Sequence, residues 1–409
     1  MSAMTRRGII GGLGCCAFGL PAAARIAPAT MHPLFAANYR PADADERGLW
    51  QDCGRLEEEL RASNLLLDAP EMQAYVTNVM TRLLGDRVRE LRIYLVRDAS
   101  FNASMAPTGL TVVNSGLLIR SRSEAQLATV LGHESGHYLR RHSLSSQRNF
   151  ERKTAVMAFI GAGAGVAAGA TAVYGGNGNS WLNLANSINS GLYASLFSFS
   201  REHEAEADAF GLRLMVEAGY PPEAAAEVWQ QRIEEDRAAA TARSRHYRSS
   251  FSAVSTHPPD AVRMIDLAAS AHDFPSEPVR PYRDGRDEWR AVIAPLRSML
   301  LDEQVKLNNP GANLYLVNAL AADGWDGTLR YYEGEIYRLR DADGDAVRAA
   351  QAYTAATALP AAPPEAWRAN GYALIKAGRR DDGRTALARY LELSPQATDA
   401  AMVRFALAQ

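Results

Sequence analysis

The stretch Gly132-His133-Glu134-Ser135-Gly136-His137 carries more information than any other in this 409-residue chain. It lies in a predicted helix over about residues 123–142, which opens at a capping box. Because residues four apart share one face of a helix, His133 and His137 can bind the same metal ion. Glu134 can reach a water on that metal instead of the metal itself. The pattern therefore predicts one zinc ion per chain, in a site that keeps a position open for water.

A second stretch, Glu204-Ala-Glu-Ala-Asp208, supplies the missing ligand from another predicted helix. Its outer carboxylates are also four residues apart. Glu204 can complete the zinc site, and Asp208 can accept the second ring proton of a liganding histidine and so fix its tautomer. The alternative is a solvated acidic face beside an exposed pair of histidines. The order and helical context of both stretches favour the metal site.

These motifs, with others around them, resemble one family of proteases. The chain resembles the BepA-like periplasmic zinc metalloproteases, gluzincins related to HtpX and the CAAX prenyl proteases, over most of its first 275 residues. The resemblance implies a mainly α protein: an α+β metalloprotease domain with a small sheet, followed by an all-α repeat domain. The additional matching residues are Asn102-Ala103, Pro107, Gly109, Gly116-Leu117-Leu118, Ser200-Arg201, Thr256-His257-Pro258 and Arg263.

The motif predicts hydrolysis of peptide bonds by a zinc-activated water, with Glu134 as the general base. His257 is a candidate donor to the oxyanion that forms in this reaction. The resemblance implies a different role, in which His257 is a fourth zinc ligand that keeps the enzyme latent. A simple turn residue beside Pro258 is the third interpretation. We interpret His142 as structural, a cation that suits the end of its helix, and His203 as structural also.

Two short stretches before the first motif predict strands. Residues 91–96 alternate like a strand, residues 107–109 form a turn, and residues 110–113 predict the strand that returns from it. The returning strand can be a sheet edge on which an extended substrate adds by backbone hydrogen bonds. An ordinary core strand is the alternative. The residues of this possible substrate edge are Leu110, Thr111, Val112 and Val113.

The C-terminal part of the chain predicts helices only. Two stretches align at a spacing of 37 residues, and the second resembles a tetratricopeptide repeat. An unrelated helical bundle is the alternative. The aligned pairs are Gly334 with Gly371, Tyr337 with Leu374, Ala349 with Ala386, and Tyr353 with Tyr390. We therefore expect an export signal over 1–24, a linker over 25–45, the zinc metalloprotease domain over 46–275, a linker over 276–290 and the repeat domain over 291–409.

The N-terminus predicts export from the cytoplasm. Two adjacent arginines, Arg6 and Arg7, precede an uncharged stretch and an Ala-rich cleavage site, as in a twin-arginine signal. An ordinary secretory signal is the alternative, and lipidation at Cys16 is a further option. The expected location is the periplasm. Residues 154–174 carry no charge and predict a helix that is buried or touches the membrane surface; a true membrane span is the alternative.

The net charge of −2, from 44 basic and 46 acidic side chains, argues against a nucleic-acid partner. Two functions remain. The first is a zinc endopeptidase that degrades unfolded or misassembled envelope proteins, with the repeats contacting the outer-membrane assembly machinery. The second is a chaperone-like repeat scaffold for outer-membrane protein assembly, whose protease stays largely latent.

Overall fold

The computed structural model describes residues 39–149, 199–244, 260–274 and 281–408. These residues are mainly helical, with one small sheet, and the predicted fold class is confirmed. The predicted export signal, residues 154–174 and His257 lie outside the described residues. None of the helices in the described ranges is both long enough and apolar enough to cross a bilayer.

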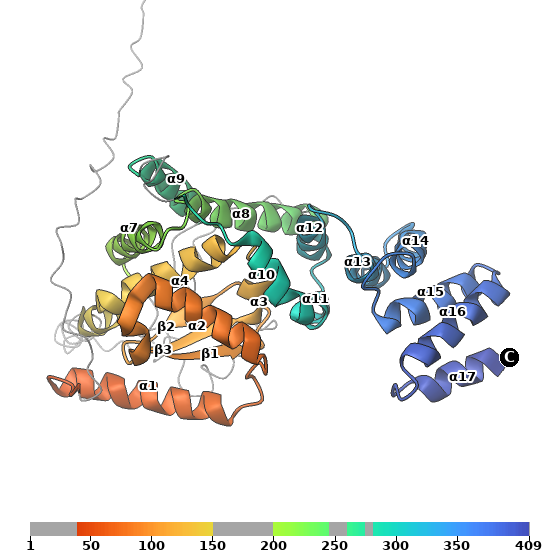
Figure 1. Cartoon of the computed structure of the whole chain (residues 1–409), viewed down its shortest axis with the longest axis horizontal. Coiled ribbons are helices and arrows are strands. Elements are labelled where there is room, and N and C mark those ends of the chain that lie inside the picture. The colour runs from red at the N-terminus through yellow and green to blue at the C-terminus, as the bar shows by residue number, and fades with distance from the viewer. Residues whose placement is uncertain (1–38, 150–198, 245–259, 275–280, 409) are drawn as a thin grey trace, which may run out of the picture.

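The first half of the chain builds a body around one central helix, α4 (Glu124–Leu139). The N-cap side chain of Ser123 accepts a hydrogen bond from the backbone N–H of Gln126, as the capping box predicts. Residues 124–138 are all buried, because helices and the sheet cover α4 from several sides (Figure 1). The surrounding elements are α2 (Pro70–Leu84), α7 (Arg201–Glu217), α8 (Ala224–Ala242), α10 (Arg286–Ile293) and β2 (Ala103–Met105).

Other elements also belong to this body. Helix α1 (Ala44–Ala62) begins at the N-cap Asp43, inside the predicted linker over 25–45, and lies beneath the sheet in Figure 1. The remaining elements are the 3-10 turn Gly85–Glu90, strands β1 (Arg92–Val96) and β3 (Leu110–Asn114), and helices α3 (Ser115–Arg120) and α9 (Asp260–Ala271).

The sheet has the strand order β1-β3-β2 within the described residues. Strand β3 runs parallel to β1 and antiparallel to β2, and all five of its residues are buried. The interpretation of residues 110–113 as a substrate edge is therefore wrong, because neighbouring strands already occupy both sides of β3. Strand β3 follows the predicted turn at residues 107–109. It pairs with β2 on one side and with β1 on the other. The strand at the edge that packs against α4 is β2.

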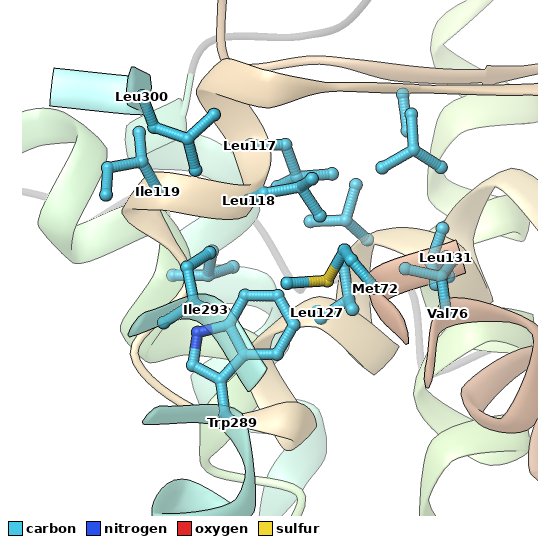
Figure 2. Packing of buried hydrophobic residues seen from close by; sticks show 14 of the residues in the cluster. Met72, Val76, Leu117, Leu118, Ile119, Leu127, Leu131, Trp289, Ile293 and Leu300 are labelled. Atoms are coloured by element: carbon cyan, nitrogen blue, oxygen red, sulfur yellow. The ribbon is translucent and has the colours of Figure 1, made fainter. Parts of the chain in front are cut away.

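The predicted linker over residues 276–290 differs from the structure at its C-terminal end. Helix α10 begins at Arg286, and Trp289 is only 1% exposed. The indole Nε1 of Trp289 donates a hydrogen bond of 2.6 Å to the carbonyl of Ser121. Figure 2 shows Trp289 and Ile293 packed among side chains of α2, α3 and α4. Residues 276–290 are rich in proline, glycine and charged residues, which is why the pattern predicted a linker.

The next helix also belongs to the protease body. In α11 (Arg297–Lys306), the buried Gln304 donates to the carbonyl of Ala99 at 2.8 Å. Glu303 of the same helix accepts from the hydroxyl of Ser115 and pairs with Arg97. The predicted boundary at residue 291 therefore falls inside one continuous packing unit.

Helix α12 (Pro310–Leu320) still packs against α8, and the helices after it extend away from this body as packed pairs (Figure 1). Two of the equivalent positions predicted at a spacing of 37 lie at helix crossings. A Cβ atom on Gly334 would come 2.4 Å from the ring of Tyr353, and one on Gly371 would come 2.7 Å from Leu387. The assignment to tetratricopeptide repeats stays a prediction. The helices that extend away are α13 (Gly327–Arg340), α14 (Asp345–Thr357), α15 (Pro364–Lys376), α16 (Arg380–Leu393) and α17 (Ala400–Ala408).

Candidate metal centre

The structure brings the three predicted metal ligands together. His133 and His137 lie on α4 and Glu204 lies on α7, and each is at most 3% exposed. One ligand atom from each residue lies within 4.8 Å of the others. The two Nε2 atoms are 3.0 Å apart, and the Glu204 carboxylate lies 3.5 Å from Nε2 of His133 and 3.7 Å from that of His137. Glu134 lies on the same helix and is 3% exposed.

Small residues allow the two ligand helices to approach this closely. A Cβ atom on Gly136 would lie 3.0 Å from the Cα of Ala207, and one on Gly132 would lie 3.0 Å from the carbonyl oxygen of Gly211. A Cβ atom on Gly211 would lie 2.6 Å from the backbone nitrogen of His133. Any larger residue at this crossing would push α7 away from α4. No role was predicted for these small residues. Gly132 and Gly136 on α4, and Ala207 and Gly211 on α7, are each four residues apart, and this spacing was a usable signal of close helix packing.

Asp208 lies behind His133, as predicted. Its Oδ1 is 2.8 Å from Nδ1 of His133. Arg263 of α9 pairs with both carboxylate oxygens of Asp208, and its guanidinium lies 3.8 Å from the centroid of the Trp229 ring. Burial raises the pKa of Asp208, but Arg263 and His133 outweigh burial and hold this pKa well below its usual range. Asp208 therefore stays ionised and holds the ring of His133 in one orientation.

The protonation of His133 follows from these contacts. Nη2 of Arg263 lies 2.8 Å from Nδ1 and donates to Asp208, but the ionised carboxylate of Asp208, also 2.8 Å from Nδ1, can only accept. An unprotonated Nδ1 would set its lone pair against the carboxylate. We therefore assign the proton to Nδ1, which leaves the lone pair on Nε2, the atom that faces His137. Arg263 was quoted above without a role, since no sequence spacing links it to Asp208, 55 residues earlier.

A second group of side chains surrounds His137. Its Nδ1 lies 3.0 Å from Nδ1 of His142, whose Nε2 lies 3.1 Å from Oε2 of Glu206. Phe199 stacks on the ring of His137, with centroids 3.8 Å apart. His203 stacks on His142 at 4.3 Å.

The interpretation of His142 as a cation closing the first helix is wrong. Helix α4 ends at Leu139, residues 142–149 form another helix, and His142 is 2% exposed. Burial lowers the pKa of His142, which favours the neutral ring.

The chemistry of the ligand set fits zinc. Two imidazole nitrogens and one carboxylate are a common protein ligand set in catalytic zinc sites. The close approach of His133 and His137 through Nε2, beside the carboxylate of Glu204, suits a bound cation. These three residues can therefore hold a single metal ion, and their donor atoms fit zinc.

The pKa of His133 predicts how the metal-free protein responds to acid. Burial, and then the charge of Arg263, lowers this pKa from 6.5 to about 4. Between these two values the unfolded chain binds a proton at His133 and the folded chain does not. The free energy of unfolding should therefore fall as the pH decreases from 6.5, by about 3 kcal/mol at pH 4 from this residue alone.

Urea unfolding of the chelator-treated protein at pH 7, 5.5 and 4.5 measures this effect. The variant His133→Gln has no titratable group at this position, so its stability should depend less on pH across the same window. An equal pH dependence in both proteins would show that His133 does not contribute.

Known proteins resemble the chain across this site. It is 25% identical over 267 residues to the beta-barrel assembly-enhancing protease of Escherichia coli (strain K12), covering 61% of this chain and 50% of that protein. It is 30% identical over 162 residues to the mitochondrial metalloendopeptidase OMA1 of Schizosaccharomyces pombe, covering 38% and 43%. The chain spans about half the length of these curated relatives or less. Residues 67–271, about half of the chain, match Peptidase family M48, and the chain therefore belongs to that family.

Proposed function

We propose that this chain is a zinc-dependent endopeptidase of the bacterial cell envelope, which hydrolyses peptide bonds of misfolded or misassembled envelope and outer-membrane proteins. The observation that carries this proposal is the convergence of His133, His137 and Glu204, all buried, from two helices onto one point. Membership of a peptidase family supports it.

The residues around this point have separate tasks. His133, His137 and Glu204 would hold the zinc, and Asp208 orients the ring of His133. Bound zinc supplies a Lewis acid that polarises the scissile carbonyl and lowers the pKa of the attacking water. Glu134 accepts the proton of that water and then donates it to the leaving amine, acting first as general base and then as general acid.

Two roles are proposed for His257. A donor beside the developing oxyanion lowers the barrier to hydrolysis, and His257 can supply one. The resemblance supports the other role, a fourth zinc ligand that keeps the enzyme latent. Comparing cleavage by wild type and His257→Ala separates the two roles, because a lost donor slows cleavage and a lost fourth ligand accelerates it.

The location and substrates rest on two observations. The N-terminal sequence has the layout of an export signal, which supports the periplasm. One relative is named a beta-barrel assembly-enhancing protease, which supports clients from the outer membrane. We extend both to this chain as part of the proposal.

The C-terminal helices offer a surface for recruiting such clients. A groove with a volume of about 1060 Å³ lies along α13, α14 and α15, and its lining includes Tyr337, Val347 and Tyr372. The proposed occupants are unfolded envelope proteins or the outer-membrane assembly machinery. This groove also favours the second candidate function, a chaperone-like scaffold with a largely latent protease.

Metal analysis combined with a cleavage assay tests the proposal. The purified full-length chain should contain about one zinc ion and should cleave casein and a urea-unfolded outer-membrane protein. A folded chain that binds no zinc would overturn the proposal. Zinc without cleavage of either substrate would favour the scaffold.

A further inference from the structure

We propose that His142 is a positioning residue for the zinc ligand His137, which it holds in the tautomer that presents Nε2 to the metal. This inference rests on the proposed zinc site. It adds to that site a hydrogen-bonded chain from Glu206 through His142 to His137.

The direction of each hydrogen bond follows from its partners. The carboxylate of Glu206 can only accept, so Nε2 of His142, 3.1 Å away, carries a proton. The other nitrogen of the neutral His142 ring then holds a lone pair. That atom, Nδ1, lies 3.0 Å from Nδ1 of His137 and accepts its proton. The remaining lone pair of His137 is therefore on Nε2, which faces Nε2 of His133.

A break in the helix makes this contact possible. In an uninterrupted α-helix, residues five positions apart point about 140° away from each other. Here α4 ends at Leu139, and Arg141 takes a left-handed conformation with φ = 58°. The chain changes direction before His142, and the ring of His142 lies beside that of His137 instead of on a different face.

Neighbouring groups fix His142 in place. Its ring is 2% exposed and stacks on His203 with an interplanar angle of 10°. Glu206 also pairs with Arg140, the C-cap residue of α4. The acceptor that faces His137 therefore has little freedom to rotate away.

Helix α7 thus supports both histidine ligands of α4 while contributing a ligand of its own. Asp208 orients His133 directly, and Glu206 orients His137 through His142. Groups of this kind behind a metal ligand typically change metal affinity by about 10–100-fold when they are removed.

Zinc affinity of three full-length variants tests the proposal. His142→Leu removes the acceptor and should weaken zinc binding, measured by competition with a chromophoric chelator, by about 10–100-fold. His142→Asn retains an acceptor oxygen near the position of Nδ1 and should recover most of the affinity. His272→Leu makes the same change at an exposed histidine and should bind zinc like wild type.

A second measurement reports the tautomer itself. Nitrogen-15 shifts of the His137 ring in the metal-free protein should show the proton on Nδ1 in wild type and His142→Asn. In His142→Leu this preference should be lost. Unfolding of each metal-free variant by urea shows whether a change in affinity reflects a loss of folding.

Three results would contradict either the positioning role of His142 or the proposed function. Unchanged zinc affinity in His142→Leu would overturn the positioning role. Equal losses of affinity and stability in His142→Leu and His142→Asn would also overturn it and leave a packing role. A folded wild type that binds no zinc would overturn the proposed function, while the tautomer of His137 in the metal-free protein would still decide whether His142 orients it.

Discussion

Replacing Glu134 by Gln is expected to lower kcat/KM for casein by about 10²–10⁴-fold and to leave one zinc ion per chain. The amide has nearly the shape of the carboxylate but cannot accept the proton of the attacking water. Zinc should remain because the proposed ligand set is His133, His137 and Glu204. Metal analysis and initial cleavage rates on the same sample measure both parts of the prediction.

Glu217→Gln is the matched control for this variant. Glu217 is an exposed residue at the end of α7, and its substitution should change neither zinc content nor rate. Full activity in Glu134→Gln would show that another group acts as the base. Expression of Glu134→Gln in cells also separates the two candidate functions, because a scaffold retains its cellular role and a protease loses it.

Replacing Gly211 by Ala is the second prediction with a large expected effect. The added methyl group would lie 2.6 Å from the backbone nitrogen of His133 and 2.8 Å from the carbonyl carbon of Gly132. Because both neighbours are backbone atoms, α7 must move away from α4. Overpacking of this kind costs about 1–3 kcal/mol of stability. Since α7 carries Glu204, we also expect zinc affinity to fall at least tenfold.

The same substitution elsewhere provides the control. Gly54 lies in α1, and a Cβ atom there would meet no other atom within 4 Å. Gly54→Ala should therefore stabilise the protein by about 0.5–1 kcal/mol, because alanine favours a helix. Thermal unfolding and chelator competition on both variants measure these effects. Gly211→Ala with wild-type stability and zinc affinity would contradict the assigned role of the helix crossing.

The sequence allowed the central ligands to be predicted because helical spacing is regular. A separation of four residues places His133 beside His137 whatever the rest of the fold does. The same regularity predicted that Asp208 shares a face with Glu204. The role of His142 could not be found in this way, because it depends on a left-handed residue at Arg141, which no glycine or asparagine signals.

The order of the strands in the sheet could not be predicted from local sequence patterns either. Residues 110–113 predict a strand correctly, yet only long-range pairing places β3 between β1 and β2. Similarly, Trp289 lies in a stretch rich in proline, glycine and charged residues. Its burial depends on a space left by α2, α3 and α4, which no local pattern around residue 289 describes.

The burial of Trp289 has a consequence for where this enzyme can be cut. The family match ends at residue 271, but a fragment ending there would lack the indole and open a gap beside Met72 and Leu127. Helix α12 packs on α8, and the hydroxyl of Tyr315 donates to Glu234 at 2.8 Å. The smallest piece able to refold independently should therefore extend through α12, to residue 320. Helix α13 also packs on α11 and α12, which joins the C-terminal helices to the catalytic body. A client bound in the proposed groove along α13, α14 and α15 would therefore reach the candidate metal centre in a limited range of orientations.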